Sequence, residues 1–379
     1  MSGRDCSFAS QAPPQKLSAS GVSPQAPSRS PSSNPSQSGV ATPDAAPLTA
    51  PSLSKLDLSE RSSINSQQDP SLDEPINLNH MELMIHLTLD KDMFNLSDGI
   101  GDFPSNFLFG IHKSLDSPYL LYQLLAFSAR HLAFLHPESS ASYHYQAAAL
   151  QTRAVSLFNA AWTEVNQSNC VPILLFSTIL GHHFLADTLA QRDPGGLEGF
   201  ITHYIQCVEM HRGIYAIAQT AWPLLMESKL EQILSWSSAF NTRPPKGSHC
   251  QRIRELIDSS DTLSETDKEA FRQAIQYLQL GFDVVLAAKE EPGNRYQMIF
   301  KWTLLAPPEF TGLLAAKRPE VLVLLAYYAL LLHHGRSMWQ IGDAGVYILG
   351  LIVDYLGPGW DYWLEYPRQM IAKDVEQAL

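Results

Sequence analysis

The sequence is poor in basic residues. It has 26 lysines and arginines against 38 aspartates and glutamates, and its formal net charge is −12 at pH 7. Because proteins bind nucleic acid electrostatically by neutralising phosphates with a basic surface, this balance excludes binding of that kind. The basic residues form only isolated pairs, such as Lys317-Arg318. We therefore expect no direct DNA binding by this chain.

Cysteines and long apolar runs are also scarce. The four cysteines stand at positions 6, 170, 207 and 250. This spacing matches neither a metal-ligand pattern nor a dense disulfide framework, so we predict reduced thiols. The longest apolar run, Val321–Leu332, has 12 residues. A helix needs about 20 residues to cross a bilayer, so we predict no membrane span.

The common signatures of enzymes are missing. The chain contains neither of the glycine-rich phosphate-binding patterns GxGxxG and GxxxxGK[ST], and it contains no GxSxG or HExxH. Its acidic residues do not form the run that would hold Mg²⁺ against a diphosphate. We predict that the protein is not an enzyme and binds no cofactor through this chain. The same reasoning assigns an ordinary structural role to the histidines near Asp187 and Glu209, which are His182, His183, His203 and His211.

The composition changes sharply near residue 76. Residues 1–75 contain 19 serines and 11 prolines, and Phe8 is their one aromatic residue. Such a segment cannot bury enough apolar surface to offset the entropy of ordering it. We predict a disordered Ser/Pro-rich tail or linker over 1–75 and a folded domain over 76–379.

The domain has the periodicity of helices. Apolar residues recur at steps of three and four over 143–161 and over 271–286, and Ser264 precedes the second stretch as a helix N-cap would. Ser117-Pro118 and Asn79 resemble further helix starts. Stretches 321–332 and 346–356 are apolar on nearly all faces, which predicts central helices. The fold class that follows is all-α, a bundle of antiparallel helices.

The aromatic residues allow two interpretations. Tryptophan and tyrosine gather between 339 and 366, and other tryptophans stand at 222, 236 and 302. They could fill the core and the helix interfaces. They could also line an apolar ligand pocket between helices, which bundle folds often contain. The pattern alone does not separate these alternatives.

The order of short blocks resembles a known family. Residues 79–86 (NHMELMIH) are followed by PYLL at 118–121 and LAFSARHLA at 125–133. The series continues with Tyr143, Asn169-Cys170, Arg212-Gly213, Phe310, Arg318-Pro319-Glu320, Trp339, Trp360, Trp363 and Tyr366-Pro367. Over residue 76 to the C-terminus the chain resembles the helical regulatory domain of fungal zinc-cluster transcription factors. The branch it resembles includes the sterol uptake control proteins.

The resemblance implies a function. Domains of this kind regulate a transcription factor according to a bound small apolar molecule or a partner, and in the sterol-linked members that molecule is a sterol. It implies a nuclear protein that regulates a metabolic or secondary-metabolite gene set, with a homodimer or other transcription factor subunits as partners. The transferable pocket region is Val321–Tyr366, with Trp339, Gly342 and Gly345 as its possible rim.

The family's DNA-binding part is a six-cysteine cluster with two zinc ions, and this chain lacks an intact one. Cys6 is the only cysteine before residue 170, and Arg4-Asp5-Cys6-Ser7-Phe8 resembles the last part of such a cluster. We hypothesise a truncated family member or a regulator that lost its DNA-reading module, with zinc implied only if an upstream cluster is missing. Alternatively, Cys6 is a chance cysteine in a disordered tail. A separate alternative for the function is a helical apolar-ligand (sterol or lipid) binding or interaction scaffold protein with no DNA role.

Overall fold

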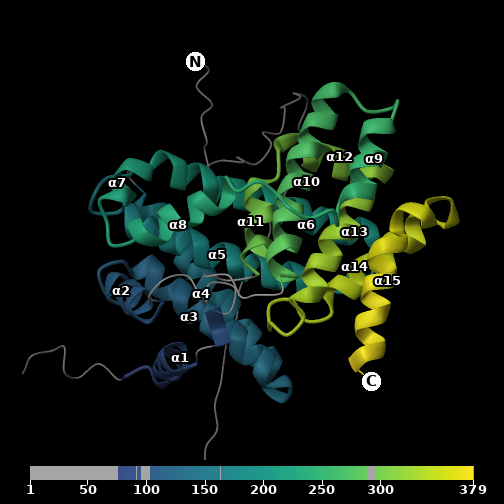
Figure 1. Ribbon diagram of the computed structural model, residues 1–379. Helices are drawn as coiled ribbons and strands as arrows, with labels where there is room; N and C mark the ends of the chain where they lie inside the picture. The colour runs from purple at the N-terminus through teal and green to yellow at the C-terminus, as the bar shows by residue number, and fades with distance from the viewer. Residues whose placement is uncertain (1–75, 91, 95–102, 163, 288–295, 379) are drawn as a thin grey trace, which may run out of the picture. The chain divides into compact units, whose positions relative to one another are not determined.

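The computed structural model describes residues 76–90, 92–94, 103–162, 164–287 and 296–378, and within these ranges every regular element is a helix (Figure 1). The predicted all-α class is therefore confirmed. Contacts group residues 76–379 into one compact unit. The predicted disordered tail over 1–75 lies outside the described residues, as does Cys6.

In the first group of helices, α6 packs against α5, and α1, α2, α4 and α5 pack around α3. Helix α3 packs most extensively against α4, with which it forms a helical hairpin, and it also contacts α1, α2 and α5. Helix α3 starts at Ser117-Pro118 as predicted. A proline is tolerated in the first helical turn because the N–H that it lacks would have no partner there. The bounds are α1 Leu78–Leu89, α2 Phe103–Leu115, α3 Pro118–Leu135, α4 Ser140–Ala161, α5 Cys170–Ala190 and α6 Leu197–Thr220.

In the second group of helices, most pack around α13, whereas α7 and α8 pack against each other. Every side chain of 321–332 on α13 is fully buried, so its prediction as a central helix is confirmed. Helices α9, α10, α12, α14 and α15 contact it, and α14 lies beside it (Figure 1). The bounds are α7 Trp222–Met226, α8 Glu231–Asn241, α9 Gln251–Ser259, α10 Glu265–Val285, α11 Gln297–Leu305, α12 Pro308–Ala315, α13 Pro319–His334, α14 Ala344–Leu356 and α15 Asp361–Ala378, with 3₁₀ turns at Asp92–Phe94, Pro137–Ser139 and Pro358–Trp360.

Two apolar helices differ from the sequence-based expectation. Helix α14 is not central, because Val346 and Tyr355 on its outer side are 45% and 52% exposed. Helix α5 is the one described helix whose length and hydropathy would suit a membrane span. However, 67% of its apolar stretch is buried inside the domain, against neighbours that include α3 and α6, so the fold uses it as a core helix.

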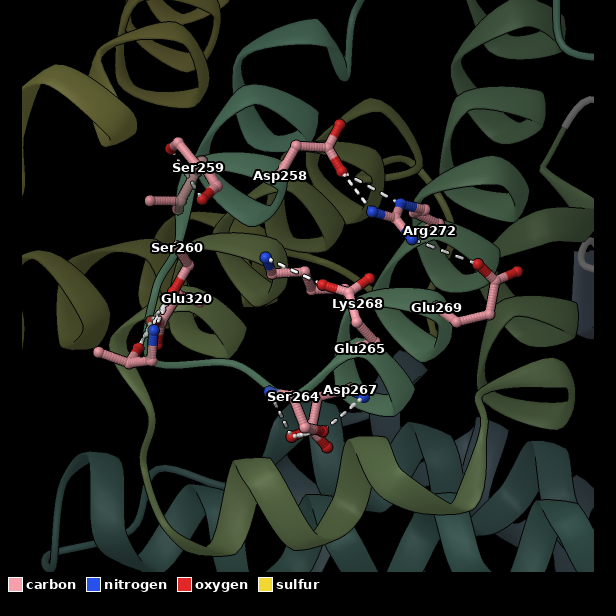
Figure 2. Close-up of polar contacts among 12 residues, drawn as sticks. Asp258, Ser259, Ser260, Ser264, Glu265, Asp267, Lys268, Glu269, Arg272 and Glu320 are labelled. Atoms are coloured by element: carbon pink, nitrogen blue, oxygen red, sulfur yellow. Dashed lines mark hydrogen bonds and ion pairs between the residues drawn. The ribbon is translucent and has the colours of Figure 1, made fainter.

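Polar contacts fix the turn between α9 and α10 (Figure 2). Ser264 caps α10 as predicted: its Oγ accepts from the Asp267 N–H at 3.1 Å, and the Asp267 carboxylate accepts from the Ser264 N–H at 3.3 Å. This reciprocal pair satisfies two backbone donors that a helix start would otherwise leave open. Arg272 of α10 also donates twice to the Asp258 carboxylate of α9. The Arg272–Asp258 pair therefore connects α10 to α9.

Glu320 at the start of α13 is anchored in the same region. Its Oε1 accepts from the hydroxyls of Ser260 and Thr262 at 3.1 and 3.0 Å, and it pairs with Arg318 at 3.3 Å. Burial alone would raise the pKa of this carboxyl group. Hydrogen bonds from its own backbone N–H and from Thr262, together with the positive charge of Arg318, hold the pKa below its usual range. The ionised carboxylate therefore connects α13 to the α9–α10 turn.

Replacing Glu320 by glutamine is expected to destabilise the domain by about 1–2 kcal/mol at pH 7, because a buried charge-assisted hydrogen-bond group loses its charge. Glu269→Gln is the matched control, since Glu269 forms an exposed pair with Arg272 (Figure 2) and such pairs contribute at most about 1 kcal/mol. Urea unfolding of both variants measures the difference. Equal losses would contradict the anchoring role of Glu320.

Candidate ligand cavity

A cavity of about 670 Å³ lies between the two groups of helices. Its walls come from α2, α3, α5, α6, α8 and α11, with Phe94 and Trp222 from two short elements. Volumes of this size are typical of small-molecule sites. Most of the lining is apolar, and it includes Ile111, Leu120, Leu124, Leu174, Leu175, Ile179, Ile214, Leu230, Ile233, Leu234, Phe300, Leu304 and Leu305.

Helical periodicity brings these side chains to the cavity. On α5 the lining residues Leu174, Leu175, Thr178, Ile179 and His182 follow steps of one, three and four. Residues so spaced share one face of a helix. The same spacing holds on α8 and α11. The cavity is therefore built from helix faces that have the same sequence pattern as a packed core.

Lys301 on α11 is the one lysine, arginine, aspartate or glutamate among the described residues that line the cavity. Its Nζ donates to the backbone oxygen of Ser237 at 3.1 Å and to Asn241 Oδ1 at 3.4 Å, and it lies 4.9 Å from the ring centre of Phe240. Burial, aided by the positive charge of Arg243, lowers the pKa of Lys301 to about 7. Among the described residues no carboxylate forms an ion pair with this ammonium group.

The histidines of the same region differ in their surroundings, although two of them pack on Phe300. His182 lines the cavity and stacks on Phe300 with ring centres 3.9 Å apart, and burial lowers its pKa to about 3. His211 is fully buried, where its Nδ1 lies 2.6 Å from the Thr303 hydroxyl, and burial lowers its pKa to about 4. His183 lies beside Asp187, whereas His203 lies beside Asp193. His182 and His211 therefore share Phe300, whereas His183 and His203 lie beside different carboxylates.

A different group brings possible metal ligands together. His86 of α1, Asp90 directly after α1, and His131 of α3 have ligand atoms within 4.8 Å of one another. The His86 Nε2 and His131 Nδ1 are 3.1 Å apart, a distance at which one ring donates a hydrogen bond to the other. Burial lowers the pKa of His131 to about 4. The geometry is that of a neutral histidine pair connecting α1 to α3.

The three predicted rim residues lie outside the lining of this cavity. Trp339 is 8% exposed, packs on His131 with ring centres 4.9 Å apart, and donates from Nε1 to the Met93 oxygen at 3.0 Å. Gln340 donates to the same Met93 oxygen at 3.1 Å. Gly342 has a φ of +51°, which suits a residue without a side chain. Gly345 lies where α14 meets α13. That these residues form a pocket rim stays a prediction.

The cysteines of the described residues are free and buried. They are Cys170, Cys207 and Cys250. Burial raises the pKa of Cys207 to about 12 and also raises that of Cys250. Protonated, inaccessible thiols of this kind are unreactive packing groups.

Sequence reasoning missed the cavity lysine. The signal that could have indicated it is the composition of α11, QMIFKWTLL, in which Lys301 is the only charged residue. A lone cation on an apolar helix points to a buried charge. Its placement in a cavity wall depends on α5 and α8, which the spacing within α11 does not reveal.

The fold and the cavity together define a class: an all-α domain with an apolar chamber between helices. The chain is similar to a protein described as a Zn(2)-C6 fungal-type transcription factor from Gibberella zeae, with 23% identity over 273 residues. The match covers 68% of this chain and 54% of that relative, so the chain spans about half of the relative's length. No protein-family model matches the chain.

Proposed function

We propose that the chain is the ligand-responsive part of a transcriptional regulator. Residues 76–379 would be its regulatory domain and residues 1–75 a linker. It would act in the nucleus on a metabolic or secondary-metabolite gene set, as a homodimer or with another transcription factor subunit. Because the chain is acidic, DNA would be read by a partner or by a zinc cluster outside the printed sequence.

The observation that carries this proposal is the apolar cavity, in a chain similar to a transcription factor. A ligand in the cavity would contact α3 and α5 as well as α6, α8 and α11. Occupancy would therefore change how the two groups of helices pack. A molecule that binds one packing arrangement better than another shifts the population toward it, which is the physical basis of a ligand-controlled switch.

A reporter assay tests the proposal. The full chain is fused to an unrelated DNA-binding domain, and we expect reporter transcription to change severalfold relative to that domain alone. Ile179→Trp, which fills the cavity, is expected to remove the response to nutrient or lipid supply. Ile85→Trp is the matched control, because Ile85 is exposed on α1. Output equal to that of the DNA-binding domain alone would contradict a regulatory role.

The cavity also favours a second candidate, an apolar-ligand carrier with no DNA role. A carrier needs only the chamber and an access route. A silent reporter fusion, combined with an apolar molecule extracted from the purified protein, would support the carrier and exclude the regulator.

A further inference from the structure

We propose that the cavity binds an apolar molecule with one carboxylate head group, and that Lys301 pairs with this carboxylate. The inference rests on the proposed function in so far as both assign a ligand to the same cavity. It concerns the chemical class of that ligand.

The charge of the lining is the first argument. Among the described lining residues Lys301 is the one lysine or arginine, and none is an aspartate or glutamate. This is unusual in a chain whose formal net charge is −12. A cavity that contains a cation and no acid has a positive potential inside low-dielectric walls, and it therefore attracts an anion.

The hydrogen bonding of Lys301 is the second argument. An ammonium group has three donors, and the structure uses two of them on neutral oxygens, those of Ser237 and Asn241. A buried charge without a counterion is costly, and an anionic partner offsets that cost.

The remaining walls of the cavity indicate the chemistry of the rest of the ligand. Apart from Thr178 and His182, the residues that α3 and α5 contribute are apolar, and burial keeps His182 neutral at physiological pH. A neutral sterol-like molecule would fill these walls but would leave the Lys301 ammonium without a counterion. A chain-like or ring-like carboxylic acid satisfies both parts of the cavity.

Binding to the purified full-length protein tests the inference. The probe is cis-9-octadecenoic acid, and the comparison ligands are the alcohol of the same chain and a sterol. We expect the acid to bind about tenfold or more tightly than the alcohol, as a charge-assisted pair requires. Lys301→Met should remove this preference, so that the affinity for the acid falls to that for the alcohol. Lys373→Met on α15 is the control, because Lys373 is exposed and outside the lining.

The pH dependence of wild-type binding provides a second test that needs no variant. Lys301 is faced by Arg243, which adds positive charge, and by His182 as the other titratable lining group near α11. With a pKa of about 7, Lys301 must take up a proton to pair with the acid at higher pH. Affinity for the acid should therefore be level from about pH 6 to 7 and fall by up to about tenfold per pH unit above that. Affinity for the alcohol should not fall.

The outcomes separate the two proposals. Equal affinities for acid and alcohol, tighter binding of the sterol, or an acid affinity that does not fall above pH 7 would overturn the carboxylate inference. Acid binding together with a silent reporter fusion would overturn the regulator and leave this inference standing. An active reporter that responds to the sterol or alcohol and not to the acid would overturn the carboxylate inference and leave the regulator standing.

Discussion

Replacing Gly345 by alanine is expected to destabilise the domain by about 3 kcal/mol, within the upper range for overpacking a core. A Cβ atom at this position would stand 2.4 Å from the backbone oxygen of Ala329 and 2.7 Å from the backbone nitrogen of His333. Both contacts are with the backbone of α13, which cannot move aside as a flexible side chain can. The added methyl group must therefore push α14 away from the central helix.

Gly350→Ala is the matched control on the same helix. Nothing lies within 4 Å of the Cβ position of Gly350, so alanine there is expected to stabilise α14 by about 0.5–1 kcal/mol through its helix propensity. Urea unfolding at pH 7 measures both free energies. Effects of the same sign would contradict the close helix contact at Gly345.

The second large effect is a loss of stability in mild acid. Burial lowers the pKa of a group of histidines to about 4 or below, and these are His131, His182, His183, His211 and His334. In the unfolded chain they would take up protons near pH 6.5, whereas in the folded chain they stay neutral. Their contribution is therefore fully present above pH 6.5 and is lost as the pH falls toward 4.

The free energy of unfolding should depend steeply on pH, because the contributions of these histidines add. Each such histidine contributes about 1.4 kcal/mol per pH unit below pH 6.5, so the group contributes several kcal/mol per unit. We expect the domain to unfold cooperatively between about pH 6 and 4. Circular dichroism measures this transition. His182→Phe keeps a ring against Phe300. It should lower the dependence of the unfolding free energy on pH by the amount that one histidine contributes. A free energy of unfolding that is level from pH 7 to 5 would contradict these buried neutral histidines.

The sequence predicted the helices well because local chemistry sets where they begin. Ser264 caps α10 and Pro118 opens α3 as expected. The cap of α1 is Asn77, and not Asn79, because two asparagines within three residues both suit the position and the sequence does not choose between them. The apolar composition of α14 predicts a central helix. Composition does not reveal that its outer face has no neighbour.

The cavity was not predictable in the same way. An apolar stripe on α5 or α8 has the same spacing whether it faces another helix or an empty volume. Trp339, predicted as a rim residue, packs on α3 and the Met93 turn, which lie more than 200 residues earlier. Such a meeting depends on the path of the whole chain. Periodicity reports which face of a helix is buried and does not report its partner.

The hydrogen bonds from Trp339 and Gln340 to the Met93 oxygen have a consequence for biosynthesis. A ribosome adds about 5–20 residues per second, and Met93 precedes Trp339 by 246 positions. Roughly 12 to 50 s therefore pass between the emergence of the first partner and that of the second. During that interval the aromatic surface around Phe127, which Trp339 later covers, is without this partner in the nascent chain. A chaperone that recognises exposed aromatic residues would have this interval in which to bind that surface.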